Sequence, residues 1–163
     1  MAITSYTTFD DIRAALGVSD DELEDSTLSL SLYEDNLDVE FDDMDFTLRE
    51  TFATVSALTS RSAVQERFLQ ATRLFATYAV AYQLTGSLPL FSPKDIGDGK
   101  ALVSRYADSP YRAVTDKVKE AYSRARARLE KAFADLGAAS APTYTPPPLM
   151  GVASGSRDPV TNS

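Results

Sequence analysis

The side chains of this sequence that are best suited to chemistry are carboxylates, because the chain contains neither histidine nor cysteine. Their absence removes thiolate nucleophiles, disulfides, an imidazole general base and the usual zinc ligand sets. The densest acidic group is Asp42, Asp43 and Asp45, but it lacks the D-x-[DN]-x-[DN]-G order of a calcium loop. No acid lies in an apolar stretch that would raise its pKa. The sequence therefore predicts no metal, no cofactor and no enzyme, with a hydrolase that uses these acids as a distant alternative.

Two other short patterns are weighed as binding motifs. Residues 96–100, IGDGK, faintly resemble a phosphate-binding loop, but the G-x-x-x-x-G-K-[ST] spacing is missing, so a turn is favoured. Arg124, Arg126 and Arg128 lie in a predicted helix and are a candidate basic face for nucleic acid or for a neighbouring subunit. No aromatic residues interleave with these arginines and the protein is acidic overall, which favours a solvated or partner-facing helix.

Charge is distributed unevenly along the chain, whose net charge is −8. Residues 1–60 hold fifteen acidic and two basic side chains, a net charge of −13. Residues 61–163 hold fourteen basic and nine acidic side chains, a net charge of +5. A molecule that is acidic at one end and basic at the other is suited to head-to-tail contact with copies of itself. The plainer alternative, that both halves simply have solvated faces, stays open.

The elements that must position these residues are organised around residues 62–86, SAVQERFLQATRLFATYAVAYQLTG. Apolar side chains at helical spacing keep one side of this stretch continuously apolar. No charge occurs between Arg73 and Lys94, so the second half is apolar nearly all round. This pattern predicts a central helix covered on several sides, ending at Gly86, where glycine accepts a left-handed conformation.

Shorter helices are predicted before this central helix. Thr8 caps a helix that Gly17 ends, and Ser19 to Glu22 have capping-box spacing for the start of a second helix. Residues 26–32 alternate like a strand, but an apolar helical pattern from Leu23 to Leu48 runs longer, so helix is preferred and strand is left open. Acids interleave with that pattern, in part within a charged, irregular turn at residues 42–45. A further helical piece is expected within residues 47–60.

After Gly86 the helical pattern breaks. Four prolines and glycines fall within residues 89–99, so residues 87–108 are predicted to be a long loop, with a short strand at residues 101–106. Ser109-Pro110 is a strong helix start, and the helix is expected to run to Leu136 and to end at Gly137. Residues 1–137 are therefore predicted to be one all-α domain, a small bundle of four to five helices around the central helix.

The remaining residues, 138–163, are predicted to form an extended, proline-rich C-terminal tail. A stiff proline run loses little conformational entropy on docking, so this tail is expected to bind a partner. Its predicted anchors are Tyr144, Pro146, Pro147, Pro148, Leu149 and Met150. No signal peptide is recognised, and the longest apolar run is too short and too polar to span a bilayer. A soluble, cytoplasmic protein with no membrane partner is expected.

Several of these patterns together resemble a known family. Residues 7–41, TTFDDIRAALGVSDDELEDSTLSLSLYEDNLDVEF, resemble the start of the head-to-tail adaptor proteins of tailed phages, also called connector or head-completion proteins. That family has a short helix ending in Leu-Gly and then an acidic, capped helix. The likeness continues through an aromatic and alanine-rich middle helix, here Phe75 to Leu84, a Pro/Gly loop and a last helix opened by Ser109-Pro110-Tyr111. It covers roughly residues 7–136, and the long proline-rich tail departs from it.

The resemblance implies a structural virion protein, assembled in the host cytoplasm. Such a protein forms a homo-oligomeric ring, dodecameric by the resemblance, in the phage neck. The ring joins the portal protein to the next neck or tail protein and continues the channel through which DNA passes without specific binding. An acidic channel wall would repel phosphates, and its candidate residues are Asp38, Asp42, Asp43 and Asp45. The alternative is a nucleic-acid-binding packaging or regulatory protein that uses the basic helix at residues 110–136.

Overall fold

The computed structural model describes residues 2–86, 95–97, 102–104 and 110–140. Within them the fold is all-α apart from one small hairpin, which confirms the predicted fold class. The elements in chain order are a 3-10 turn at Ile3–Ser5, α1 (Phe9–Leu16), α2 (Asp25–Leu28), α3 (Ser31–Met44), α4 (Leu48–Ser56), α5 (Ala63–Leu84), β1 (Asp95–Gly97), β2 (Leu102–Ser104) and α7 (Pro110–Ser140).

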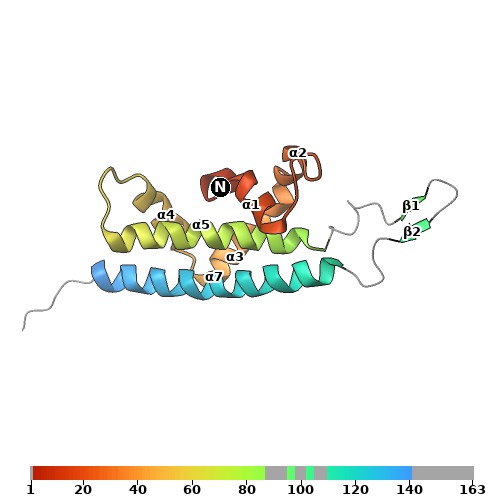
Figure 1. Ribbon diagram of the computed structural model, residues 1–163. Coiled ribbons are helices and arrows are strands. Elements are labelled where there is room, and N and C mark those ends of the chain that lie inside the picture. The colour runs from red at the N-terminus through yellow and green to blue at the C-terminus, as the bar shows by residue number, and fades with distance from the viewer. Residues whose placement is uncertain (1, 87–94, 98–101, 105–109, 141–163) are drawn as a thin grey trace, which may run out of the picture.

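The central element is α5, as the sequence predicts. Ser62 and Gln65 form a capping box at its start: the Ser62 hydroxyl accepts from the Gln65 N–H, and the Gln65 side chain accepts from the Ser62 N–H. Phe68 and Phe75 are fully buried, and the second half of the helix is buried on almost every side. A long antiparallel partner, α7, lies along the whole of α5 (Figure 1).

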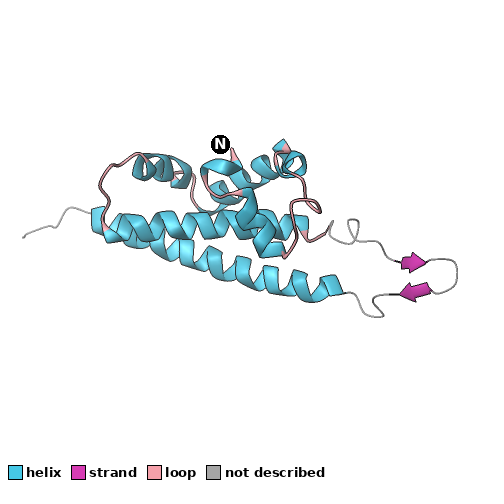
Figure 2. Ribbon diagram, turned by 45° about the horizontal axis from the view of Figure 1, so that its top comes forward, coloured by secondary structure: helices cyan, strands magenta, loops and turns pink. Residues whose placement is uncertain are grey.

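The remaining helices form a second layer on this pair. Helices α1, α3 and α4 each contact α5, and Figure 2 shows them on one side of the two long helices. An aromatic cluster joins the layers, with ring centroids 4.8 Å apart for Tyr6 and Phe41, 5.3 Å for Phe41 and Phe75, and 5.7 Å for Phe75 and Tyr122. Burying each such side chain contributes about 1.5–3 kcal/mol, so this cluster helps to hold the N-terminal layer on the long helices.

One predicted helix end, at Gly137, is wrong, and the other, at Gly86, is right in position but not in backbone conformation. Gly86 does not take the left-handed conformation; among the described residues Gly17 alone has a positive φ, 71°, at the end of α1. Helix α5 ends at Leu84, where Thr85 caps it. Gly137 lies inside α7, which continues to Ser140, so this glycine does not end the helix. Its 31 residues span about 47 Å at 1.5 Å per residue.

The predicted second helix starting at Ser19 is also wrong. Glu22 does reach back to accept from the Ser19 N–H at 2.9 Å, but the chain makes only a turn there, and α2 starts at Asp25. The buried guanidinium of Arg13 holds this segment instead. Its Nε donates to the Leu23 carbonyl at 2.8 Å, and its outer nitrogens pair with Asp25 and with Asp10, the latter at 3.1 Å.

Residues 26–32 are helical rather than extended, but not in one piece. Helix α2 ends at Leu28 and α3 begins at Ser31, with Ser29 and Leu30 between them. The irregular turn predicted at residues 42–45 begins later, because α3 runs to Met44. Asp45 then makes the turn into α4, accepting from the Thr47 N–H at 2.8 Å and from its hydroxyl at 2.6 Å.

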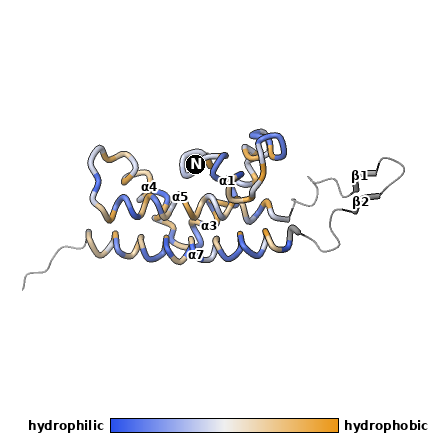
Figure 3. Tube along the Cα trace, viewed as in Figure 1, coloured by the Kyte–Doolittle hydropathy of each residue, from blue (hydrophilic) through white to orange (hydrophobic). Residues whose placement is uncertain are grey.

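Figure 3 shows how hydropathy follows this architecture, with hydrophilic and hydrophobic segments alternating along α7. On this helix Val118, Ala125, Leu129 and Leu136 recur at helical spacing and are buried. Strand β2 falls within the strand predicted at 101–106 and pairs antiparallel with β1, Ile96 opposite Val103. The rest of the predicted loop at 87–108, Ser109 and residues 141–163 lie outside the described residues.

The depth of the central helix gives a stability prediction. Phe75→Ala should lower the free energy of unfolding by about 3–5 kcal/mol, because the ring is fully buried between α3 and α7. Urea unfolding followed by circular dichroism measures this. Gln70→Ala, at an exposed polar position of the same helix, is the control and should cost about 0.5 kcal/mol. Equal costs at both positions would contradict the placement of α5.

Candidate functional site

The four predicted channel acids do not act as one face. Arg49 of α4 reaches back to α3 and binds two of them: its Nη1 lies 2.9 Å from Asp38 Oδ2, and its Nη2 lies 2.7 Å from Asp42 Oδ2. The single positive charge of Arg49 therefore offsets one of these two negative charges and fixes both carboxylates in place. Burial raises the pKa of nearby Tyr6 to about 12, and the negative charge of Asp38 adds to this effect.

The other two predicted acids have different environments. Asp45 is half-buried in the turn between α3 and α4, where hydrogen bonds from Thr47 lower the pKa of its carboxyl group. Asp43 is exposed at the surface of α3. Of the four, it is the residue best placed to meet a partner, because the structure assigns the others local roles.

The three predicted basic residues are also separated by the structure. Successive positions two apart on an α-helix differ by about 200°, so Arg126 points away from Arg124 and Arg128. Arg126 pairs with Glu130 at 3.1 Å and lies 3.9 Å from Glu40 of α3. Arg124 lies 3.6 Å from Glu120, and Arg128 is exposed on the side away from α3. The three therefore do not form a single basic face for nucleic acid.

A polar cluster that the sequence did not reveal fastens α3 to the long helices. The Tyr122 hydroxyl donates to Glu40 Oε2 at 2.5 Å, and Asn36 donates to Gln83 at 3.3 Å. Burial and the hydrogen bond to Glu40 raise the pKa of Tyr122 to about 12. These groups lie 82 and 47 residues apart in the chain, so no local pattern could have predicted the pairs.

The acids of the described residues do not gather into a candidate metal centre. No group of three or more such side chains in residues 2–86, 95–97, 102–104 and 110–140 is arranged to hold a metal ion. Among the same residues, no helix has the length and apolar character needed to cross a membrane. A polar hollow between α1 and α2 is lined by Asp10, Arg13 and Asp25, whose mutual pairing gives them a structural role.

Large apolar side chains are exposed on and beside α3. Leu32 is 60 % exposed, Val39 is 57 % exposed, and Phe46, in the turn after the helix, is 83 % exposed. The carboxylates of Asp35 and Asp43 lie exposed on the same helix. We call this group of five side chains the α3 patch. Exposed apolar groups bordered by charges are typical of protein-binding surfaces.

A groove between α5 and α7 has the opposite charge. It has a volume of about 440 Å³, an apolar floor and a largely basic rim. The floor consists of Val64, Ala71, Leu74 and Ala132, and the rim includes Arg67, Arg128 and Lys131. Asp135 on the rim lies 3.1 Å from Lys131 and offsets part of that charge. We call this feature the α5–α7 groove.

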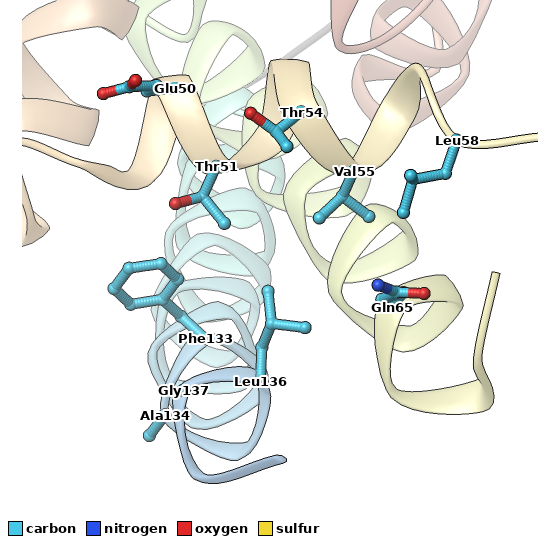
Figure 4. Close-up of a pocket in the computed structure, with 10 residues that line it drawn as sticks. All are labelled: Glu50, Thr51, Thr54, Val55, Leu58, Gln65, Phe133, Ala134, Leu136 and Gly137. Atoms are coloured by element: carbon cyan, nitrogen blue, oxygen red, sulfur yellow. The ribbon is translucent and has the colours of Figure 1, made fainter. Parts of the chain in front are cut away.

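A second groove lies where α4 approaches the C-terminal end of α7 (Figure 4). Its volume is about 610 Å³. Phe133 and Leu136 point into it from α7, facing Val55 and Thr51 of α4, and Glu50 is its one charged lining residue. None of these side chains has the arrangement of a nucleophile and its base, so this groove also suits packing rather than chemistry.

The Tyr122 cluster gives a prediction in alkaline solution. The unfolded chain loses tyrosine protons near pH 10, whereas Tyr122 and Tyr6 in the folded protein hold theirs to about pH 12. Stability present below pH 10 is therefore lost as the pH rises through this window. Tyr122→Phe removes one of the two groups, so its free energy of unfolding should fall less steeply from pH 10 to 12. Urea unfolding at each pH measures the slope, and identical slopes for both proteins would contradict the assignment.

No protein-family model matches the sequence, and neither a curated protein nor a solved structure matches it. Function must therefore be inferred from the charges, the exposed apolar side chains and the grooves of the chain itself.

Proposed function

We propose that this chain is a structural subunit without enzymatic activity that assembles with copies of itself into a ring in the neck of a tailed phage. In this role it joins the portal protein to the next neck or tail protein. The DNA passes through the ring without specific binding. The resemblance of residues 7–136 to head-to-tail adaptor proteins motivates the proposal, and the surface of the all-α domain supports it.

The observation that carries the proposal is the α3 patch. Three large apolar side chains are exposed to solvent, although fully burying each of them would contribute about 1.5–3 kcal/mol. A second protein surface could supply that burial, whereas a small polar substrate could not. The grooves of the described residues are lined by packing and ion-paired side chains, which favours a binding role over catalysis.

The charge distribution supports contact between copies. The N-terminal layer of α1 to α4 carries most of the fifteen acids of residues 1–60, whereas α7 carries seven basic and four acidic side chains. Opposite potentials on different parts of one molecule steer copies into a repeated orientation rather than a random one. The tail predicted to start at residue 138 begins later, because residues 138–140 belong to α7. Residues 141–163 are proposed to extend the contacts to the portal or to a sister subunit.

The proposal predicts a large particle. Native mass spectrometry of the purified chain, alone and with a portal protein from the same source, should show a closed ring of identical subunits that binds the portal. A chain that stays monomeric in both samples would contradict the proposal. Salt-dependent binding of DNA that is lost in Arg124→Ala/Arg128→Ala would instead favour the packaging or regulatory alternative.

The tail has its own test. Deleting residues 141–163 leaves all described helices intact, so we expect the circular dichroism spectrum and the urea midpoint to be unchanged while binding to the portal is lost. A matched control replaces Tyr144, Leu149 and Met150 by serine in the full-length chain and should also lose binding. Normal portal binding by both variants would show that the tail is not an anchor.

A further inference from the structure

We propose that copies of this chain join head to tail, with the α3 patch of one copy seated in the α5–α7 groove of the next. This inference rests on the proposed function, since it names the contact by which the ring would form. Both surfaces belong to the described residues, and no other element among those residues covers either of them.

The α3 patch projects directly outward. Leu37 and Phe41 turn inward and are buried, at 1 % and 0 % exposure. Leu32 and Val39 are seven residues apart and so lie on one side of the helix, about 140–180° around it from Leu37 and Phe41. Their exposure therefore follows from the way α3 packs, and Phe46 extends the apolar surface into the next turn.

The α5–α7 groove offers a matching floor. Leu74 is 38 % exposed there although it lies on the most buried helix of the protein. It stands beside Ala71 and Ala132, whose short side chains leave the space that makes the hollow. A cavity of about 440 Å³ can receive large side chains such as Leu32 and Val39 without displacing either helix.

Charge favours the α5–α7 groove over the groove of Figure 4 as the binding site for the α3 patch. Asp35 and Asp43 border the α3 patch, while Arg67 and Arg128 border the α5–α7 groove, so opposite charges would meet when the apolar parts are in contact. The groove in Figure 4 contributes Glu50 and no basic side chain. It would place a carboxylate against the acidic patch, which disfavours it as the receptor.

The two surfaces lie on opposite sides of the α5·α7 pair. On α5, Gln83 contacts α3, and Leu74 is nine residues away, about 180° around the helix. On α7, Arg126 faces Glu40 of α3, while Arg128 lies about 160° from it. The patch and its groove point in opposite directions. A copy whose α3 patch is bound to one neighbour therefore still has its α5–α7 groove free for another copy, as a ring requires. Two α3 patches facing each other would instead oppose like charges.

The chain has no cysteine, so introduced thiols report contacts without background. Val39→Cys and Leu74→Cys are made as separate proteins, mixed and oxidised with copper phenanthroline. Head-to-tail contact predicts a disulfide-linked dimer of one variant with the other in the mixture. A single chain carrying both changes should give a ladder of dimer, trimer and larger species on non-reducing gels.

Controls separate this contact from others. Ser123→Cys is exposed on α7 away from the groove and should give no dimer when mixed with Val39→Cys. Asp35→Lys/Asp43→Lys in the double-cysteine chain should abolish the ladder, and adding Arg67→Glu/Arg128→Glu should restore it. Both starting positions are exposed, and circular dichroism verifies that each variant is folded.

The outcomes distinguish this inference from the proposed function. If the unaltered chain forms rings by native mass spectrometry but the double-cysteine chain gives no ladder, the contact lies elsewhere and the ring stands. Efficient dimers of Val39→Cys alone would show α3 patches facing each other and would overturn the head-to-tail arrangement. If the unaltered chain forms no assembly, alone or with the portal, both proposals fail.

Discussion

The burial of α5 is the interaction on which the rest of this structure depends. Its second half has no polar side to offer to water, so the protein must cover it from several directions at once. Helix α7 supplies one cover along the full length, and α1, α3 and α4 supply the others. The aromatic rings of Phe41, Phe75 and Tyr122 meet where these covers join, which ties the acidic N-terminal layer to the basic last helix.

That arrangement brings many carboxylates close together, and a few arginines reduce the repulsion between them. Arg13 is buried and holds the turn before α2, Arg49 binds two acids of α3, and Arg126 meets Glu40 across the layer boundary. Partly exposed pairs of this kind contribute little each, about 0–1 kcal/mol, so they orient the helices more than they stabilise them. The unpaired acids of the described residues, including Asp35 and Asp43, remain exposed and make the surface of α3 negatively charged.

The sequence was a good guide to elements and a poor guide to their ends. Strong periodicity and the Ser62 capping box located α5, because both signals are local. Gly86 correctly marked the end of α5, whereas Gly137 lies inside α7, since a glycine permits a helix end without imposing one. The predicted acidic and basic faces are divided by the fold, because several of their members pair within the chain instead of sharing one side of a helix. Arg49 can pair with Asp38 and Asp42 only because the turn at Asp45 brings α4 back to α3. By contrast, the separation of Arg126 from Arg128 could have been predicted by counting positions around the helix.

The long antiparallel pairing of α5 with α7 also fixes when the protein can fold. During synthesis α5 leaves the ribosome well before Pro110, and until α7 follows, one whole side of its apolar surface has no cover. The nascent chain therefore passes through a stage that holdase chaperones recognise and that favours aggregation. Since α7 supplies one wall of the α5–α7 groove, that groove exists only once synthesis has passed the end of α7.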